Sequence, residues 1–166
     1  DYMKMYKISN MWKDMNLVVD ESYEEPLIPC GDLIGDYGMW ILDDTGLLTI
    51  DMMYPMPDYD LYKDLQYLSR YINSVLFTDN CTSLEKGSLF PHNLYSENYI
   101  RAKELYLGKN ITDIGAFKFT NLSSLTDVYC FAETPPTMLD WYGYEECGPF
   151  ELDWLNSKNT TLHVLK

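Results

Sequence analysis

The chain of 166 residues has little positive charge, and this shortage excludes a large class of partners. Twelve lysines and arginines stand against 26 aspartates and glutamates, so the formal net charge is −14 at pH 7. Basic residues form no run anywhere in the sequence. Phosphate groups would therefore be repelled over most of the surface. We expect neither nucleic acid nor an anionic membrane surface as a partner.

Long hydrophobic runs are also missing. The longest, such as GLLTI at 46–50 and VLF at 75–77, fall far short of the roughly 20 residues that a membrane-spanning helix needs. The first residues do not show the charged and then apolar pattern of a secretory leader. We expect a soluble segment with no membrane insertion. Its 46% of apolar residues is enough for a single domain with a sizeable core.

Motifs for catalysis are scarce. The only histidines, His92 and His163, lie far apart in the sequence. The chain has no Gly-x-Ser-x-Gly, no glycine-rich phosphate loop and no His-Glu-x-x-His. No nucleophile therefore has an identifiable base, and we expect neither enzymatic activity nor a cofactor.

Acidic residues are plentiful, and three groups of them raise the question of a metal site or an acid-base pair. The aspartates of DYDLYKD, residues 58–64, lack the glycine and terminal glutamate of a calcium loop, which favours a helix cap and a solvated helix face. The sequence Asp-Asp-Thr-Gly at 43–46 separates two apolar stretches and predicts a hairpin turn. Glu145 and Glu146 would serve as acid and base only if the fold fixed their separation, and nothing in the sequence does so.

The four cysteines are widely spaced, at Cys30, Cys81, Cys130 and Cys147. Without a Cys-x-x-Cys pair, and with so few histidines, structural zinc is not expected. Disulfides would allow three full pairings that the sequence does not rank. Cys81 and Cys130 fall where the repeat described next requires a small buried residue, so we favour buried, mostly reduced thiols.

The sequence contains an internal repeat. Residues 75–84 align with residues 105–114 at a constant offset of 30, without a gap. VYC at 128–130 and LHV at 162–164 look like further copies of the short strand that begins each unit. Between them, residues 110–129 place apolar residues mostly three apart, which fits neither a helix nor a strand. This pattern predicts a coil that repeatedly returns to one interior.

Successive side chains of a strand point to opposite faces of the sheet. In each short strand the two apolar end residues should therefore point into the core, and the middle residue should point outward. The expected core positions are Val75, Phe77, Leu105, Leu107, Val128, Cys130, Leu162 and Val164. If the strands stack in parallel, the outward residues form one column made of Leu76, Tyr106, Tyr129 and His163. No unit buries its apolar face alone, so the units must stack.

Residues 110–136, NITDIGAFKFTNLSSLTDVYCFAETPP, closely resemble a known repeat family. The similarity is to the bacterial surface-antigen (BspA-like) leucine-rich repeat, and the matching positions are Ile111, Thr112, Ile114, Gly115, Phe119, Ser123, Ser124 and Leu125. Residues 30–59 are similar to the β-rich segment that often precedes such repeats, and TTLHVLK at the end is similar to a closing segment. The first unit departs from the pattern, with Glu85 in place of the glycine.

The expected fold is a β-rich leucine-rich-repeat solenoid of the α/β repeat class, with a short parallel sheet. Residues 1–29 form an N-terminal extension, and residues 30–166 form a single domain. Within it we expect a capping β segment at 30–57, a helix at 58–72, and repeats with a C-terminal cap at 73–166. The helix is predicted from the spacing of its apolar residues, with Asp58 or Asp60 as the candidate N-cap. These apolar residues follow one another at steps of 4, 3 and 4 and are Leu61, Leu65, Leu68 and Ile72.

Aromatic residues, 15% of the chain, mark the candidate binding positions. Outward tyrosines suit recognition because they offer a large contact area and a hydroxyl group. The opposing explanations are cross-strand stacking for the strand residues and capping of the coil for the cluster in LDWYGYEECG, residues 139–148. The candidates are Tyr106, Tyr129, Phe131, His163, Trp141, Tyr142 and Tyr144.

Asn80, Asn110, Asn121 and Asn159 each begin a glycosylation acceptor pattern. We interpret them instead as turn residues, since asparagine favours tight bends.

The resemblance implies a bacterial protein that is secreted or held at the cell surface and acts in adhesion. The functional hypothesis is noncatalytic binding of a protein or glycan through one face of the solenoid. The alternatives are a structural or spacer module of a larger surface protein and, less favoured, a carbohydrate-active enzyme with two carboxylates in one cleft.

Overall fold

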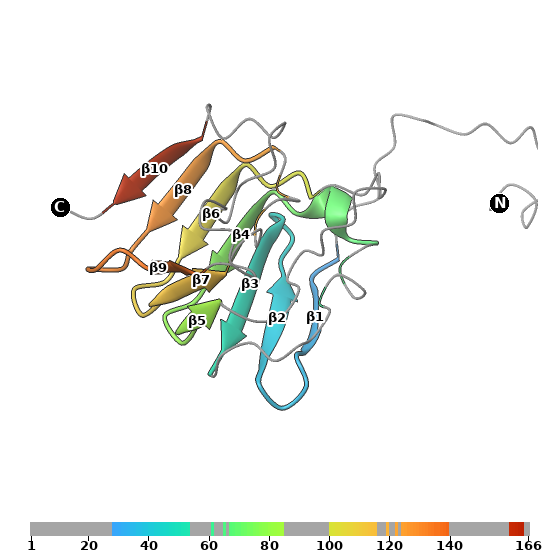
Figure 1. The fold of residues 1–166 in the computed structure, drawn as a ribbon. Helices are drawn as coiled ribbons and strands as arrows, with labels where there is room; N and C mark the ends of the chain where they lie inside the picture. Colours follow the sequence, from blue (N-terminus) through green and yellow to red (C-terminus); the bar gives the residue numbers. More distant parts are fainter. Residues whose placement is uncertain are drawn as a thin grey trace, which may run out of the picture.

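The protein is mostly β-strand, which confirms the predicted β-rich class (Figure 1). The computed structural model describes residues 28–53, 61, 65, 67–84, 100–115, 119, 122, 124–139 and 160–164. Within these residues the strands form a mixed sheet of seven strands, here called the large sheet, and a small sheet of three. Most of the proposed N-terminal extension, residues 1–27, lies outside the described residues.

The large sheet starts with an antiparallel meander. β1 (Cys30–Leu33) pairs with β2 (Gly38–Leu42), which pairs with β3 (Leu47–Met52). The predicted hairpin turn at 43–46 joins β2 to β3 and is confirmed. Its Asp43 carboxylate accepts hydrogen bonds from the Thr45 hydroxyl at 2.7 Å and from the Leu47 backbone N–H at 2.9 Å. These hydrogen bonds, led by that from the Thr45 hydroxyl, lower the pKa of Asp43.

The rest of the large sheet is parallel. β4 (Ser74–Phe77), β6 (Glu104–Leu107), β8 (Asp127–Cys130) and β10 (Thr161–Val164) follow β3 in that order (Figure 1). The predicted offset of 30 is the register of the β4–β6 pair, in which Val75 lies opposite Leu105 and Phe77 opposite Leu107. β6 and β8 continue it, with Leu107 opposite Cys130. The repeated sequence therefore corresponds to a repeated strand.

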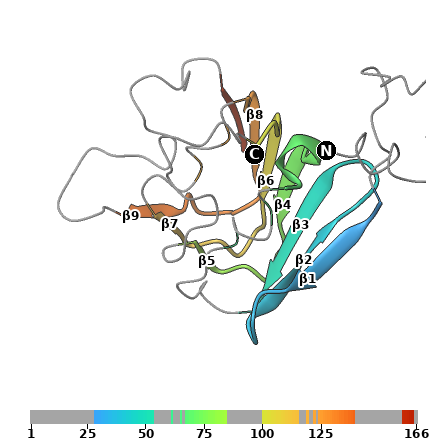
Figure 2. The same ribbon diagram turned by 90° about the vertical axis from the view of Figure 1, so that its right-hand side faces the viewer.

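The small sheet contains one short strand from each turn of chain that follows β4, β6 and β8. Its members are β5 (Ser83–Leu84), β7 (Asp113–Gly115) and β9 (Thr137–Leu139), all parallel. Figure 2 shows them running across the direction of β4, β6 and β8, to one side of the large sheet. Each turn of chain thus contributes one strand to each sheet.

One hydrophobic core lies between the two sheets. It contains Phe77, Leu107 and Cys130 from the large sheet, and Leu84 and Ile114 from the small one. The Phe77 ring also meets the ring of Phe119, with centroids 6.1 Å apart. The predicted common interior of the successive strands is therefore confirmed for β4, β6 and β8.

The prediction that β10 buries two residues in this core is wrong. Leu162 is 63% exposed and Val164 is 65% exposed. They stand in the expected rows, opposite Val128 and Cys130. However, the described part of the small sheet ends at β9, which follows β8, so it provides no strand to cover β10. Alternation gave the direction of these side chains correctly but not their burial.

The helix predicted at 58–72 is described only in part. The Leu65 backbone N–H donates to the Leu61 carbonyl at 3.1 Å, which is the spacing of an α-helix. The last turn is instead a 3₁₀ helix, η1 (Ser69–Tyr71). Leu61, Leu65 and Ile72 are fully buried, so the predicted apolar face does pack on the core. The candidate caps Asp58 and Asp60 lie outside the described residues.

Side-chain contacts tie the turns after β4 and β6 to the chain of the preceding unit. The Asn80 amide donates to the Asp51 carboxylate at 2.9 Å, and the Asn110 amide donates to the Asp79 carbonyl at 2.6 Å. Lys109 adds an ion pair with the Asp79 carboxylate at 2.8 Å. The interpretation of Asn80 and Asn110 as turn residues is thus confirmed, whereas Asn121 and Asn159 lie outside the described residues.

Cys30, Cys81 and Cys130 are free thiols, and Cys81 and Cys130 are buried as predicted. The Cys81 S–H donates to the Ile50 carbonyl at 3.4 Å. Burial raises the pKa of the Cys81 thiol. Cys147 lies outside the described residues.

Among the described residues, none belongs to a helix with the length and apolar character required to cross a bilayer.

Candidate binding face on the large sheet

The predicted outward column exists on the face of the large sheet that points away from the core. Tyr106 lies opposite Leu76 on one side and Tyr129 on the other, and Tyr129 lies opposite His163. We call this the outer face. Leu76 and both tyrosines are half-buried, and His163 is exposed.

Three of these side chains form a continuous stack. The Tyr106 and Tyr129 ring centroids are 4.8 Å apart with an interplanar angle of 9°. Tyr129 and His163 are 4.4 Å apart at 12°. Parallel strands place equivalent side chains about 4.8 Å apart, so planar side chains in one row stack in this way. Both faces of the Tyr129 ring are therefore covered by neighbouring rings.

Phe131, which follows β8 directly, extends the aromatic surface. Its ring lies 6.5 Å from that of Tyr106 at an interplanar angle of 14°, and the residue is 37% exposed. The structure thus brings together Tyr106, Tyr129, Phe131 and His163. The other sequence candidates, Trp141, Tyr142 and Tyr144, lie outside the described residues, as do Glu145 and Glu146.

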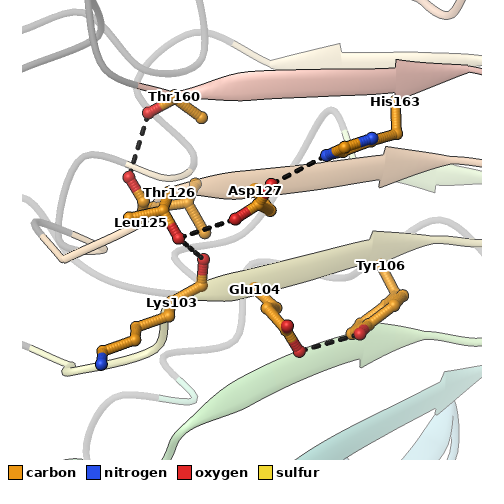
Figure 3. A network of polar contacts seen from close by, with 8 residues as sticks. All are labelled: Lys103, Glu104, Tyr106, Leu125, Thr126, Asp127, Thr160 and His163. Atoms are coloured by element: carbon orange, nitrogen blue, oxygen red, sulfur yellow. Dashed lines mark hydrogen bonds and ion pairs between the residues drawn. The ribbon is translucent and has the colours of Figure 1, made fainter.

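A row of carboxylates runs beside the rings. Glu104 and Asp127 lie opposite each other, each two residues before a stacked tyrosine. The Tyr106 hydroxyl donates to Glu104 Oε2 at 2.8 Å, and His163 Nε2 lies 2.8 Å from Asp127 Oδ1 (Figure 3). Each carboxylate therefore holds one end of the aromatic stack in place.

These contacts shift the pKa values of two groups. The hydrogen bond to Glu104, together with burial and the carboxylate charge, raises the pKa of Tyr106 to about 12. The contact with His163, followed by that with Thr126, lowers the pKa of Asp127. Near neutral pH the tyrosine is therefore a hydrogen-bond donor and Asp127 is a carboxylate.

Threonines just before the strands fix where the rows begin. The Thr126 hydroxyl lies 2.8 Å from Asp127 Oδ2 and 3.2 Å from the Lys103 carbonyl. The Thr160 hydroxyl donates to the Leu125 carbonyl at 3.0 Å (Figure 3). In each case a side chain of one unit bonds to the backbone of the preceding unit, which holds the register that the aromatic stack requires.

The outer face is acidic and carries no permanent positive charge on its parallel strands. Its strand residues from β3 to β10 are Leu47, Thr49, Asp51, Ser74, Leu76, Glu104, Tyr106, Asp127, Tyr129, Thr161 and His163. On β1 and β2 the same face continues with exposed apolar side chains, those of Leu33, Met39 and Ile41. A partner would meet ring edges and apolar groups beside carboxylates.

Alternation along β6 and β8 also places Glu104 and Asp127, which the aromatic pattern alone did not indicate, on the outer face. Residues two apart on a strand point to the same face, so both carboxylates follow from the positions of Tyr106 and Tyr129. Their hydrogen bonds depend on side-chain torsions, which alternation does not specify. Within the part of the chain that the structure describes, His, Cys, Asp and Glu side chains form no group of three suited to a metal ion.

No family model, curated protein or solved structure matches this chain. The binding proposal below therefore depends on the geometry of the outer face, together with the sequence resemblance described above.

Proposed function

We propose that the chain is a noncatalytic binding module of a secreted or surface-held bacterial protein. We further propose that it is a leucine-rich-repeat solenoid of the BspA-like type and that it binds its partner through the outer face. The parallel strands at repeated offsets, the second sheet and the shared core support this architecture. The adhesion class and the location come from the sequence resemblance alone.

The observation that carries the binding proposal is the ordered stack of Tyr106, Tyr129 and His163. Aromatic side chains give much contact energy, and side chains already fixed in place lose little entropy on binding. The stack is fixed twice, by ring contacts and by bonds to Glu104 and Asp127. It therefore has the properties of a preformed anchor.

The geometry favours a protein partner over a glycan. A sugar ring packs against the open face of an aromatic ring, and both faces of the Tyr129 ring are covered. The stack instead presents ring edges next to exposed apolar residues on β1 and β2. The acidic row fits a partner surface with lysine or arginine, and such attraction speeds association and weakens in salt.

The test is a screen of the protein against protein and glycan arrays, followed by affinity measurements on each hit. Tyr106→Ala and Tyr129→Ala should each weaken binding by about 10-fold or more, as expected for anchor residues. Tyr67→Ala is the matched control, because Tyr67 is 80% exposed and lies outside the stack. Unchanged binding in both stack variants would remove this site.

The second candidate function is a structural or spacer module with no ligand of its own. It is favoured by the same stack if the rings serve only to hold β6, β8 and β10 in register. The absence of any hit on both arrays, with a stability loss in Tyr129→Ala, would support it. A carbohydrate-active enzyme is less favoured, since the lowered pKa of Asp127 does not suit a proton donor.

A further inference from the structure

β10 is the last strand of the large sheet (Figure 1). Among the residues that the structure describes, it pairs with β8 on one side and with no strand on the other, and this unpaired side is called the open edge. The Thr161 N–H donates to the Thr126 carbonyl at 2.8 Å, toward β8. Because backbone groups alternate along a strand, Leu162 and Val164 direct their N–H and C=O groups to the open edge. This edge can therefore accept another strand.

The same two residues leave apolar surface uncovered. Leu162 and Val164 are 63% and 65% exposed on the inner face of the sheet, in line with the buried rows of β6 and β8. Edge strands usually carry a lysine, a proline, an inward charge or a bulge that prevents pairing. β10, with the sequence Thr-Leu-His-Val, has no such residue.

The opposite edge of the sheet differs. On β1, Asp32 Oδ1 accepts a hydrogen bond from the Leu33 N–H at 2.7 Å, so that amide is already occupied. The Asp32 charge also stands on the edge strand itself. A head-to-tail chain of copies, with β10 of one adding to β1 of the next, is therefore disfavoured.

We propose that β10 is a homodimerisation edge, at which two copies pair their β10 strands antiparallel about a twofold axis at His163. In this register Leu162 lies opposite Val164 of the second copy, and His163 lies opposite its own equivalent. A twofold interface requires such a self-complementary surface. The inference does not depend on the proposed binding function.

The directions of the backbone N–H and C=O groups of β10 agree with this register. Leu162 and Val164, whose backbone groups point outward, become the hydrogen-bonded pairs of an antiparallel ladder. His163 becomes the non-hydrogen-bonded pair, in which side chains come closest and Cα atoms are about 4.5 Å apart. The exposed apolar residues of each copy then cover those of the other on the inner face. On the outer face the two imidazoles meet and join the aromatic stacks.

The first experiment is sedimentation equilibrium of the purified chain over a range of concentrations. High salt is used so that the repulsion between two copies of net charge −14 is screened. The mass should approach about twice the 19.4 kDa of the chain as concentration rises. Leu162→Lys and Val164→Lys should each keep the monomer mass, and because both positions are exposed the variants should remain folded.

Leu33→Lys is the matched control, since Leu33 is 61% exposed on the opposite edge. It should dimerise like the wild type. A wild-type chain that stays monomeric, or a Leu33→Lys variant that loses the dimer as Leu162→Lys does, overturns the proposal.

The second experiment tests the register. In a Cys30→Ser, Cys147→Ser background, His163→Cys should form an intermolecular disulfide with diamide as oxidant, because the Cα separation suits that bond. Leu162→Cys, which lies opposite Val164 of the second copy, should cross-link much less. Equal cross-linking of both variants overturns the twofold register.

Discussion

At the scale of single residues, the outer face is organised by pairs of side chains two positions apart or on adjacent strands. Tyr106 bonds to Glu104 on its own strand, whereas His163 bonds to Asp127 across β8 and β10. Both contacts lie on the solvent side of the sheet, so they orient side chains more than they add stability. Their expected signature is a shifted pKa.

Glu104→Gln should bring the pKa of Tyr106 down from about 12 toward its ordinary value of 10.0, because it removes the carboxylate that accepts the hydroxyl hydrogen bond and, with it, the nearby negative charge. The measurement is an NMR titration of the chain with ¹³C-labelled tyrosine side chains. In the wild type the associated stabilisation is fully present below the unfolded-state pKa near 10.0 and is lost as the pH rises through about 12.

Glu133→Gln is the control, because Glu133 is an exposed glutamate that lies after the end of β8, outside the aromatic stack. It should leave the Tyr106 titration unchanged. A Tyr106 signal that titrates identically in the wild type and Glu104→Gln would contradict the assigned hydrogen bond.

At the scale of elements, the β2–β3 turn shows what local sequence determines. Asp43 and Gly46 were sufficient to predict the hairpin, because the hydrogen bonds of Asp43 and the positive φ of Gly46 are local features. The end of the helix was not predictable in the same way. The step from Leu68 to Ile72 fits an α-helix, yet η1 is a 3₁₀ turn; such turns are frequent at helix ends, and the spacing of apolar residues does not distinguish them from a last α-helical turn.

Gly46→Ala should destabilise the protein by about 1 to 3 kcal/mol in urea unfolding. Gly46 has φ +83°, and an added Cβ would lie 2.4 Å from the Tyr71 carbonyl oxygen. Gly35→Ala is the matched control, with φ +54° and a nearest neighbour at 3.5 Å, so it should lose clearly less. Equal losses in the two variants would show that contact with Tyr71 does not matter.

At the scale of the whole molecule, sequence alternation and the 30-residue offset were enough to predict how β4, β6 and β8 stack. Val75, Leu105 and Val128 are buried in one row, as expected. The same rule failed at Leu162, because alternation gives the direction of a side chain but not whether a second sheet covers it. Contacts of the outer face, such as that of Asp127 with His163, required the assembled strands.

The central structural claim is that successive units stack in parallel over one core, and methyl NOE spectroscopy tests it most directly. Parallel register predicts contacts of Val75 with Leu105 and of Leu105 with Val128, together with ring contacts between Tyr106 and Tyr129. The reversed pattern of an antiparallel hairpin, with Val75 near Leu107 instead of Leu105, would contradict the account.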